Sequence, residues 1–165
     1  MFSIGSKVVH PCYGAGTIVR VQEKSIGTDV HSYYVIRTIS RSMQLMVPVN
    51  RADSFGLRMV GQEGELRDAL LACRDTPSEE AIERDLRARQ SDMRERLKSG
   101  DYDGVAEVVR TLFFMNSRRA LGTVDRQLFE QGKEFLAGEL ALASNLDISG
   151  AMDEVQDHLA KMLDE

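Results

Sequence analysis

The sequence predicts an α+β protein in which a small β-barrel is followed by an all-helical domain. Residues 1–60 alternate between apolar and polar side chains, as strands do, and carry glycine and proline at their breaks. Residues 61–165 instead repeat apolar side chains every three or four positions, as helices do. The 165 residues, 42% of them apolar, suffice for two small domains, and we place the boundary between residues 60 and 61.

The first sixty residues contain four or five short segments with the composition of strands. Residues 7–10, 17–24, 33–39 and 43–49 are rich in β-branched and aromatic side chains. A turn signal of glycine and proline, residues 11–16, separates the first two segments. Short strands at a spacing of about ten residues, with no helix between them, are typical of a small barrel.

Helical segments are expected after Gly56. One short helix carries Leu66, Leu70 and Cys73. The next begins at Thr76, a capping residue that precedes a proline and has a glutamate three positions later, and it extends to Leu97. Three further helices are expected from their cap or starting residues, which are Asp101, Thr123 and Ser149.

Composition excludes several classes of protein. The chain has no run of about 18 apolar residues, so a membrane span is not expected. Its first residues show no charged region followed by an apolar stretch, so no secretory signal is visible. Two cysteines, Cys12 and Cys73, are too few for a disulfide framework. We expect a cytoplasmic protein with reduced thiols and no membrane partner.

The net charge of −5 hides an asymmetry between the two domains. Residues 1–60 hold seven Lys and Arg against three acids, a balance of +4, and residues 61–165 hold 14 against 23, a balance of −9. Attraction to phosphates supplies most of non-specific nucleic-acid binding, so a chain this acidic does not coat DNA. Contact with DNA would need a local basic patch and the help of a partner.

Signs of catalysis are missing from the sequence. The histidines are scattered, and neither Cys-x-x-Cys nor His-Glu-x-x-His spacing occurs. The stretch 14–16 is glycine-rich but lacks the following helix of a dinucleotide fingerprint, and no P-loop is present. We expect no metal, no cofactor and no enzymatic activity, although a hydrolase or a small-ligand enzyme stays open as a minor alternative.

The predicted helix over residues 76–97 carries a basic stripe. At about 100° per residue, four cations fall on one face, and they are Arg84, Arg87, Arg94 and Lys98. Such a stripe could bind phosphates, or it could be the solvated face of an ordinary amphipathic helix. Leu86 falls on the opposite, apolar face with Met93 and Leu97, where a leucine most often belongs to the core.

One predicted strand offers an apolar residue to solvent. In the segment 43–49, Met43, Leu45 and Val47 point to one face of the strand and Met46 points to the other, so the side chain of Met46 is a candidate for exposure. An exposed strand there would suit docking by a strand or loop of another protein. Packing inside the barrel is the alternative.

Five motifs, in order and with similar spacing, resemble those of one family. They are the stretch Gly5–Gly16, the stretch Met46–Ala52 followed by Gly56–Arg58, the stretch Leu97–Asp101, the stretch Val105–Leu112 and the stretch Ala137–Ala143. Together they cover nearly the whole length of the chain. On these motifs the sequence resembles the CarD/CdnL family of bacterial transcription regulators.

The resemblance implies a function for each domain. It implies a Tudor-like barrel over residues 1–60 that binds the β subunit of bacterial RNA polymerase, with Lys24 and Met46 at contact positions. It implies a helical domain over residues 61–165 that touches promoter DNA at the upstream edge of the bubble and stabilises the open complex. Leu86 stands where the family has a wedging tryptophan, and Arg89 stands at a cationic position. The expected DNA-binding set is therefore Arg84, Leu86, Arg87, Arg89, Arg94 and Lys98.

A second hypothesis is an adaptor that binds polymerase but has lost direct contact with DNA. The absence of tryptophan and the balance of −9 in residues 61–165 favour it. Protection of forked promoter DNA, with and without polymerase, distinguishes the two.

Overall fold

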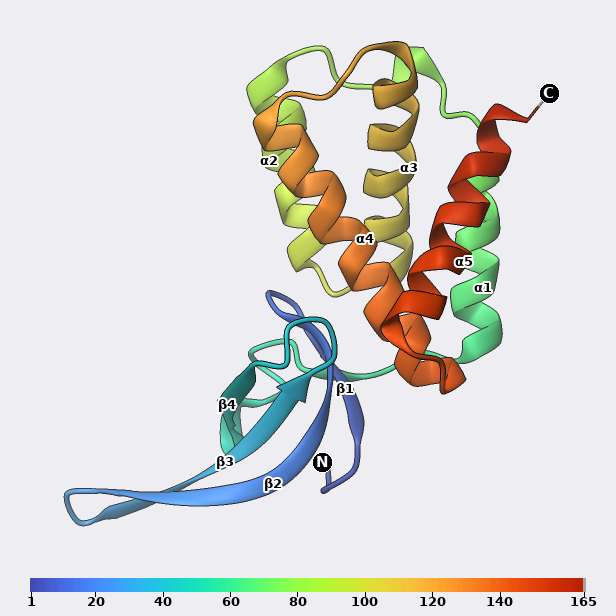
Figure 1. Ribbon diagram of the computed structural model, residues 1–165. Helices are drawn as coiled ribbons and strands as arrows, with labels where there is room; N and C mark the ends of the chain where they lie inside the picture. Colours follow the sequence, from blue (N-terminus) through green and yellow to red (C-terminus); the bar gives the residue numbers. More distant parts are fainter. Residues whose placement is uncertain (165) are drawn as a thin grey trace.

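Five antiparallel strands form one sheet at the N-terminal end of the chain, as the computed structural model shows (Figure 1). The structure describes residues 1–164. The strands are β1 (Lys7–His10), β2 (Gly14–Ile26), β3 (Asp29–Thr38), β4 (Gln44–Pro48) and β5 (Arg58–Met59). Their order in the sheet is β4-β3-β2-β1-β5.

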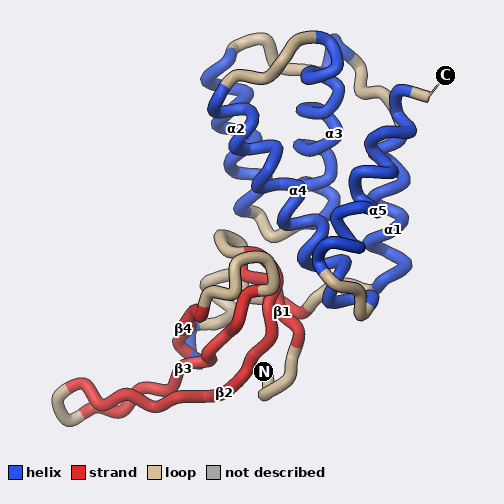
Figure 2. The backbone as a smooth tube through the Cα atoms, in the orientation of Figure 1, coloured by secondary structure: helices blue, strands red, loops and turns tan. Residues whose placement is uncertain are grey.

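The sheet is not closed, which corrects the expectation of a complete barrel. β4 and β5 are the two edges and do not pair with each other. The chain between them forms a 3₁₀ turn (Val49–Arg51) and a loop, and β5 contains only two residues, too few to close a barrel. The α+β class and the order of sheet before helices are confirmed, and the curved open sheet is consistent with a Tudor-like domain (Figure 2).

β2 and β3 form a hairpin that is longer than the rest of the sheet. The two strands pair from Gly16 opposite Thr38 out to Ile26 opposite Asp29. β4 reaches along β3 only as far as Tyr33. The outer part of the hairpin therefore extends as a two-stranded ribbon beyond the sheet (Figure 1).

The sheet has its own apolar core on one face. Val8, Ile18, Ile36 and Val47 are almost completely buried there. Tyr34 also lies in this core, with its hydroxyl bonded to the backbone oxygen of Phe2 at 3.3 Å. This burial fixes which face of each strand points inward, because side chains alternate along a strand.

Five α-helices follow the sheet within the described residues. They are α1 (Glu63–Leu71), α2 (Leu86–Lys98), α3 (Tyr102–Arg118), α4 (Thr123–Ser144) and α5 (Ile148–Ala160). The longest of them, α4, packs against α3 and α5, and the C-terminal end of α4 lies on β2 (Figure 1). Leu136 and Leu140 of α4 are completely buried. Among residues 1–164, no helix combines the length and the apolar character needed to cross a bilayer.

The predicted helix over residues 76–97 is wrong in its first half. Residues Glu79–Ala81 form only a 3₁₀ turn, and the backbone of Ile82 is extended. Ser78 makes no side-chain cap, whereas the carboxylate of Asp85 accepts a hydrogen bond from the backbone nitrogen of Ala88 at 3.1 Å. The stronger cap at Asp85 sets the start of α2 at Leu86.

Candidate functional site

Three exposed cations lie along one face of α2. Arg87, Arg94 and Lys98 are seven and four residues apart, so they fall within about 40° of one another around the helix. All three are exposed, while Met93 and Leu97 on another face are buried. The shared face is as the sequence predicted, and its contact with DNA stays a prediction.

These three cations have no carboxylate partner within the described part of the chain. None of the ion pairs formed among residues 1–164 includes Arg87, Arg94 or Lys98. Arg96, on a different face of α2, is instead paired with Asp92 at 3.1 Å. The stripe of Arg87, Arg94 and Lys98 therefore retains its positive charge for an external anion.

Leu86 is exposed at the start of α2. It is the first residue of the helix, and 55% of it is accessible to solvent. The buried face of α2 begins only one turn later, so the apolar side chain is not covered by the bundle. The expectation that Leu86 most often belongs to the core is wrong. Arg84 is exposed too, but it precedes the helix and does not share the helical stripe.

Arg89 does not belong to this exposed surface. It is only 6% exposed, and its guanidinium donates to both oxygens of Asp125 on α4, at 2.9 and 2.8 Å. The amide of Gln90 donates to the same carboxylate at 3.2 Å. These hydrogen bonds, chiefly those of Arg89, lower the pKa of Asp125. The structure thus corrects the assignment of Arg89 to the DNA-binding set, because its charge is directed into the protein.

The stripe continues onto α4 across a shallow hollow. The hollow has a volume of about 180 Å³, and its lining includes Arg94 and Lys98 of α2 with Gln127 and Gln131 of α4. Glutamine amides and cationic side chains are both common donors to nucleic-acid phosphates. Sequence spacing within one helix does not predict these two glutamines, because they reach the stripe only through the packing of α4 beside α2.

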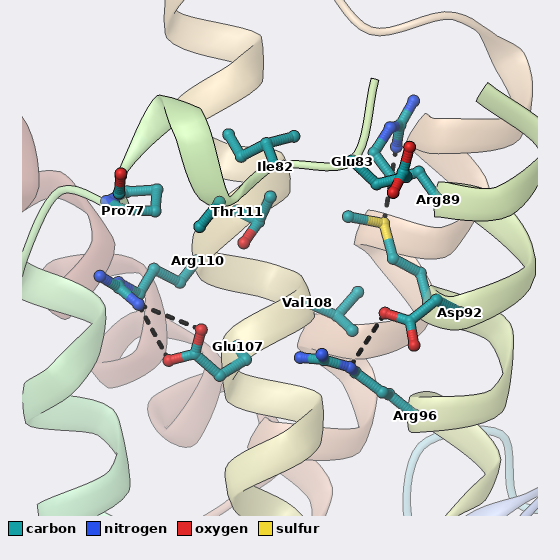
Figure 3. A pocket seen from close by; sticks show the side chains of 13 residues that line it. Pro77, Ile82, Glu83, Arg89, Asp92, Arg96, Glu107, Val108, Arg110 and Thr111 are labelled. Atoms are coloured by element: carbon teal, nitrogen blue, oxygen red, sulfur yellow. Dashed lines mark hydrogen bonds and ion pairs between the residues drawn. The ribbon is translucent and has the colours of Figure 1, made fainter. Parts of the chain in front are cut away.

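A second cavity lies on another side of α2 and has a different character. It has a volume of about 230 Å³ and lies between α2, α3 and the segment before α2 (Figure 3). Its three arginines are each paired with a carboxylate: Arg110 with Glu107 at 2.9 Å, Arg96 with Asp92 at 3.1 Å (Figure 3), and Arg89 with Asp125 outside the cavity. It therefore offers less free positive charge to an anion than the stripe does.

Lys24 and Met46 lie on the same face of the sheet. In the strand register, Met46 is opposite Val35, which is opposite Arg20, and Lys24 follows Arg20 by four residues on the same strand. Side chains that are opposite each other, or separated by an even number of residues, point to the same side. Both are exposed, Met46 by 37%, so the expected exposure of Met46 is confirmed.

β4 also presents its backbone at an edge. Within the described residues it pairs only with β3, so its outer edge has no strand beside it. Such an edge can accept a strand from another protein. The backbone edge therefore adjoins Met46, whereas Lys24 lies further out, on the β2–β3 ribbon.

Two family models match the chain, one for each part of the fold. The description "CarD-like/TRCF RID domain" matches residues 2–61, and "CarD, C-terminal domain" matches residues 70–156. A curated protein of Bacillus subtilis (strain 168), named "Putative transcription factor YdeB", is 29% identical over 146 residues, which is 88% of this chain and 94% of the relative.

The chain has an open sheet followed by a helical domain, and the two family models match these parts in the same order. This arrangement defines a transcription regulator of two domains. The chain belongs to the CarD family. The resemblance stated from the sequence motifs is therefore confirmed.

Proposed function

We propose that this protein is a non-enzymatic transcription factor that binds the β subunit of RNA polymerase and stabilises the promoter open complex. In this proposal the edge of β4, with Lys24 and Met46, docks on polymerase. The start of α2 faces promoter DNA near the upstream fork of the bubble.

The observation that carries the proposal is the surface of α2. An exposed leucine, Leu86, begins the helix, and the unpaired cations Arg87, Arg94 and Lys98 continue along it. Apolar side chains that enter a base step, flanked by cations on the phosphates, are a recurrent way to hold distorted DNA. The amides of Gln127 and Gln131 add donors beside these cations.

The acidity of the helical domain fits a factor that depends on polymerase. A balance of −9 over residues 61–165 opposes free binding to DNA. Docking on polymerase holds the α2 surface at high effective concentration beside one stretch of DNA, so a few weak contacts suffice.

The test is a charge reversal on the stripe. Arg87→Glu with Arg94→Glu should shorten the lifetime of promoter open complexes relative to wild type, while binding to the β subunit is unchanged. The matched control is Arg96→Glu with Arg126→Glu, which changes the net charge equally on other faces of α2 and α4. Equal loss of both activities in a folded stripe variant, or equal effects of the stripe and control variants, would contradict the proposal.

The adaptor remains a second candidate, because the chain has no tryptophan and its helical domain is acidic. It predicts that forked promoter DNA gains no protection when the protein is added to polymerase. The measurement is footprinting on forked DNA, with and without polymerase, at one fixed salt concentration.

A further inference from the structure

Glu139 of α4 is the centre of a polar contact between the sheet and the helices. It is only 2% exposed, and its carboxylate accepts two hydrogen bonds from the guanidinium of Arg58 in β5, at 2.7 and 2.8 Å. The backbone nitrogen of Gly61 donates to it as well, at 2.8 Å. A paired guanidinium and carboxylate with two parallel bonds fixes both orientation and distance.

The same arginine reaches the end of α2. The Nε atom of Arg58 donates to the backbone oxygen of Gly100 at 2.5 Å. Gly100 lies two residues after Lys98, the last residue of α2. One side chain of the sheet therefore holds both α4 and the end of the helix that carries the stripe.

Other contacts hold the C-terminal end of α4 on the sheet over about two turns. Gly138 packs so closely that an added Cβ would lie 3.1 Å from Ile39 and 3.7 Å from Ala15. Further along, the ammonium of Lys7 donates to the backbone oxygen of Leu142 and to the side chain of Asn145, both at 2.9 Å. These contacts add to the polar contact at Glu139, which lies between them and joins α4 to both β5 and the end of α2.

At its other end, α4 holds the start of α2. Asp125 accepts the two hydrogen bonds of the buried Arg89, which lies one turn after Leu86. Asp125 and Glu139 are 14 residues apart on a single helix, a separation of about 21 Å. The helix between them is continuous, so the two carboxylates stand at a fixed distance.

We infer that α4 fixes the DNA-facing start of α2 relative to the polymerase-docking sheet, and that Glu139 is the positioning residue of this coupling. The inference rests on the proposed function for the two surfaces. It adds that the protein acts as one rigid body, so that docking of the sheet determines where Leu86 and the stripe are placed.

The test replaces Glu139 with glutamine. The Glu139→Gln side chain has the same shape but presents an NH₂ group to donors, so at least one of the three hydrogen bonds is lost. The matched control is Glu130→Gln, an identical change at an exposed position of the same helix. Arg58→Lys is the second variant, because it keeps the charge and loses the paired geometry. Thermal unfolding shows which variants are folded at the assay temperature.

Two readouts follow. Paramagnetic labels at Asp53→Cys and Ala88→Cys, in a Cys12→Ser background, report the distance between the sheet domain and α2. We expect one narrow distance distribution for wild type and Glu130→Gln, and a broader one for Glu139→Gln and Arg58→Lys. We expect the latter two to bind the polymerase β subunit as wild type does and to lose most of the extension of open-complex lifetime.

A narrow distribution and a full lifetime extension in folded Glu139→Gln and Arg58→Lys would overturn the inference. If wild type itself does not extend the lifetime, the proposed function fails. In that case the distance distribution still decides whether Glu139 couples the two parts of the protein.

Discussion

Arg89 of α2 and Asp125 of α4 form a buried ion pair with two hydrogen bonds, at 2.9 and 2.8 Å. Truncating one partner of such a pair leaves the other charge buried without compensation, and this costs about 3 kcal/mol of folding free energy. We therefore expect Asp125→Ala to lower the free energy of unfolding by about this amount, as measured by urea denaturation.

Two comparisons separate this effect from a general loss of charge. Asp92→Ala breaks the exposed pair with Arg96 and should cost less than about 1 kcal/mol. The double change Arg89→Leu with Asp125→Leu removes both charges and should be more stable than Asp125→Ala alone. If the double variant is no more stable than Asp125→Ala, the uncompensated buried charge of Arg89 is not the cause of the lost stability.

The pair also explains one limit of prediction from sequence. The wheel of α2 placed Arg87, Arg94 and Lys98 together correctly, because the periodicity of one helix determines its faces. The same wheel places Arg89 within about 40° of Met93, on the buried face. It does not identify Asp125, the carboxylate that compensates the buried charge, because Asp125 lies 36 residues away and comes close only through tertiary packing.

The start of α2 was missed for a different reason. Thr76, Pro77 and Glu79 have the composition of a helix start, but no helix begins after Thr76, and Glu79–Ala81 form only a 3₁₀ turn. Asp85 forms a side-chain cap, and the true helix begins after it. Several cap-like residues in a short stretch cannot be ranked by composition alone.

The strands of the sheet could be predicted from the alternation of apolar and polar residues. Closure of the sheet into a barrel could not, because it depends on pairing between edges that are distant in sequence, and alternation does not encode that pairing.

His158 predicts a dependence of stability on pH. Its Nδ1 atom accepts a hydrogen bond from Nε of Arg74 at 2.9 Å, so the neutral imidazole fits this contact and a protonated one does not. Burial, followed by the positive charge of Arg74, lowers the pKa of His158; Lys161 acts in the same direction, and Glu154 and Asp157 oppose it. The unfolded chain then binds this proton at higher pH than the folded chain.

The sign follows from that difference. The contribution of His158 to stability is complete above the unfolded pKa of about 6.5 and is lost as the pH falls from there through the lowered folded pKa. We expect the free energy of unfolding to decrease over this acidic range, and His158→Gln, which keeps an acceptor for Arg74, to reduce the decrease. Burial also lowers the pKa of His10. Part of the acidic decrease in the free energy of unfolding should therefore persist in His158→Gln, and adding His10→Gln should reduce it further. Identical pH profiles for wild type and His158→Gln would exclude this role.

Leu86 predicts a gain of function by substitution. The residue is exposed at the start of α2, so a larger side chain fits there without displacing the core. Leu86→Trp adds aromatic surface for contact with an unstacked base, and stacking of this kind is worth about 1–3 kcal/mol. We expect a longer open-complex lifetime for Leu86→Trp, a shorter one for Leu86→Ser, and unchanged polymerase binding for both.

The control for Leu86 is Leu163→Trp, at another exposed leucine distant in sequence from α2. It should leave the open-complex lifetime as it is in wild type. If Leu86→Trp protects forked promoter DNA in the presence of polymerase and wild type does not, the natural protein is better described as an adaptor that binds polymerase without contacting DNA.

Lys24 and Met46 predict the site of polymerase binding. Both side chains are exposed and point to the same side of the sheet; Met46 lies on the edge strand β4, and Lys24 lies on the outer part of the β2–β3 hairpin. Lys24→Glu with Met46→Glu places two negative charges on that face, so we expect at least about tenfold weaker capture by the isolated β-subunit lobe, a loss of about 1.4 kcal/mol. The change lies outside the core, so the midpoint temperature of thermal unfolding should shift little.

The matched control is Arg51→Glu with Phe55→Glu, which alters an exposed cation and an exposed apolar residue between β4 and β5. Equal capture of the two double variants would place the polymerase contact on another surface.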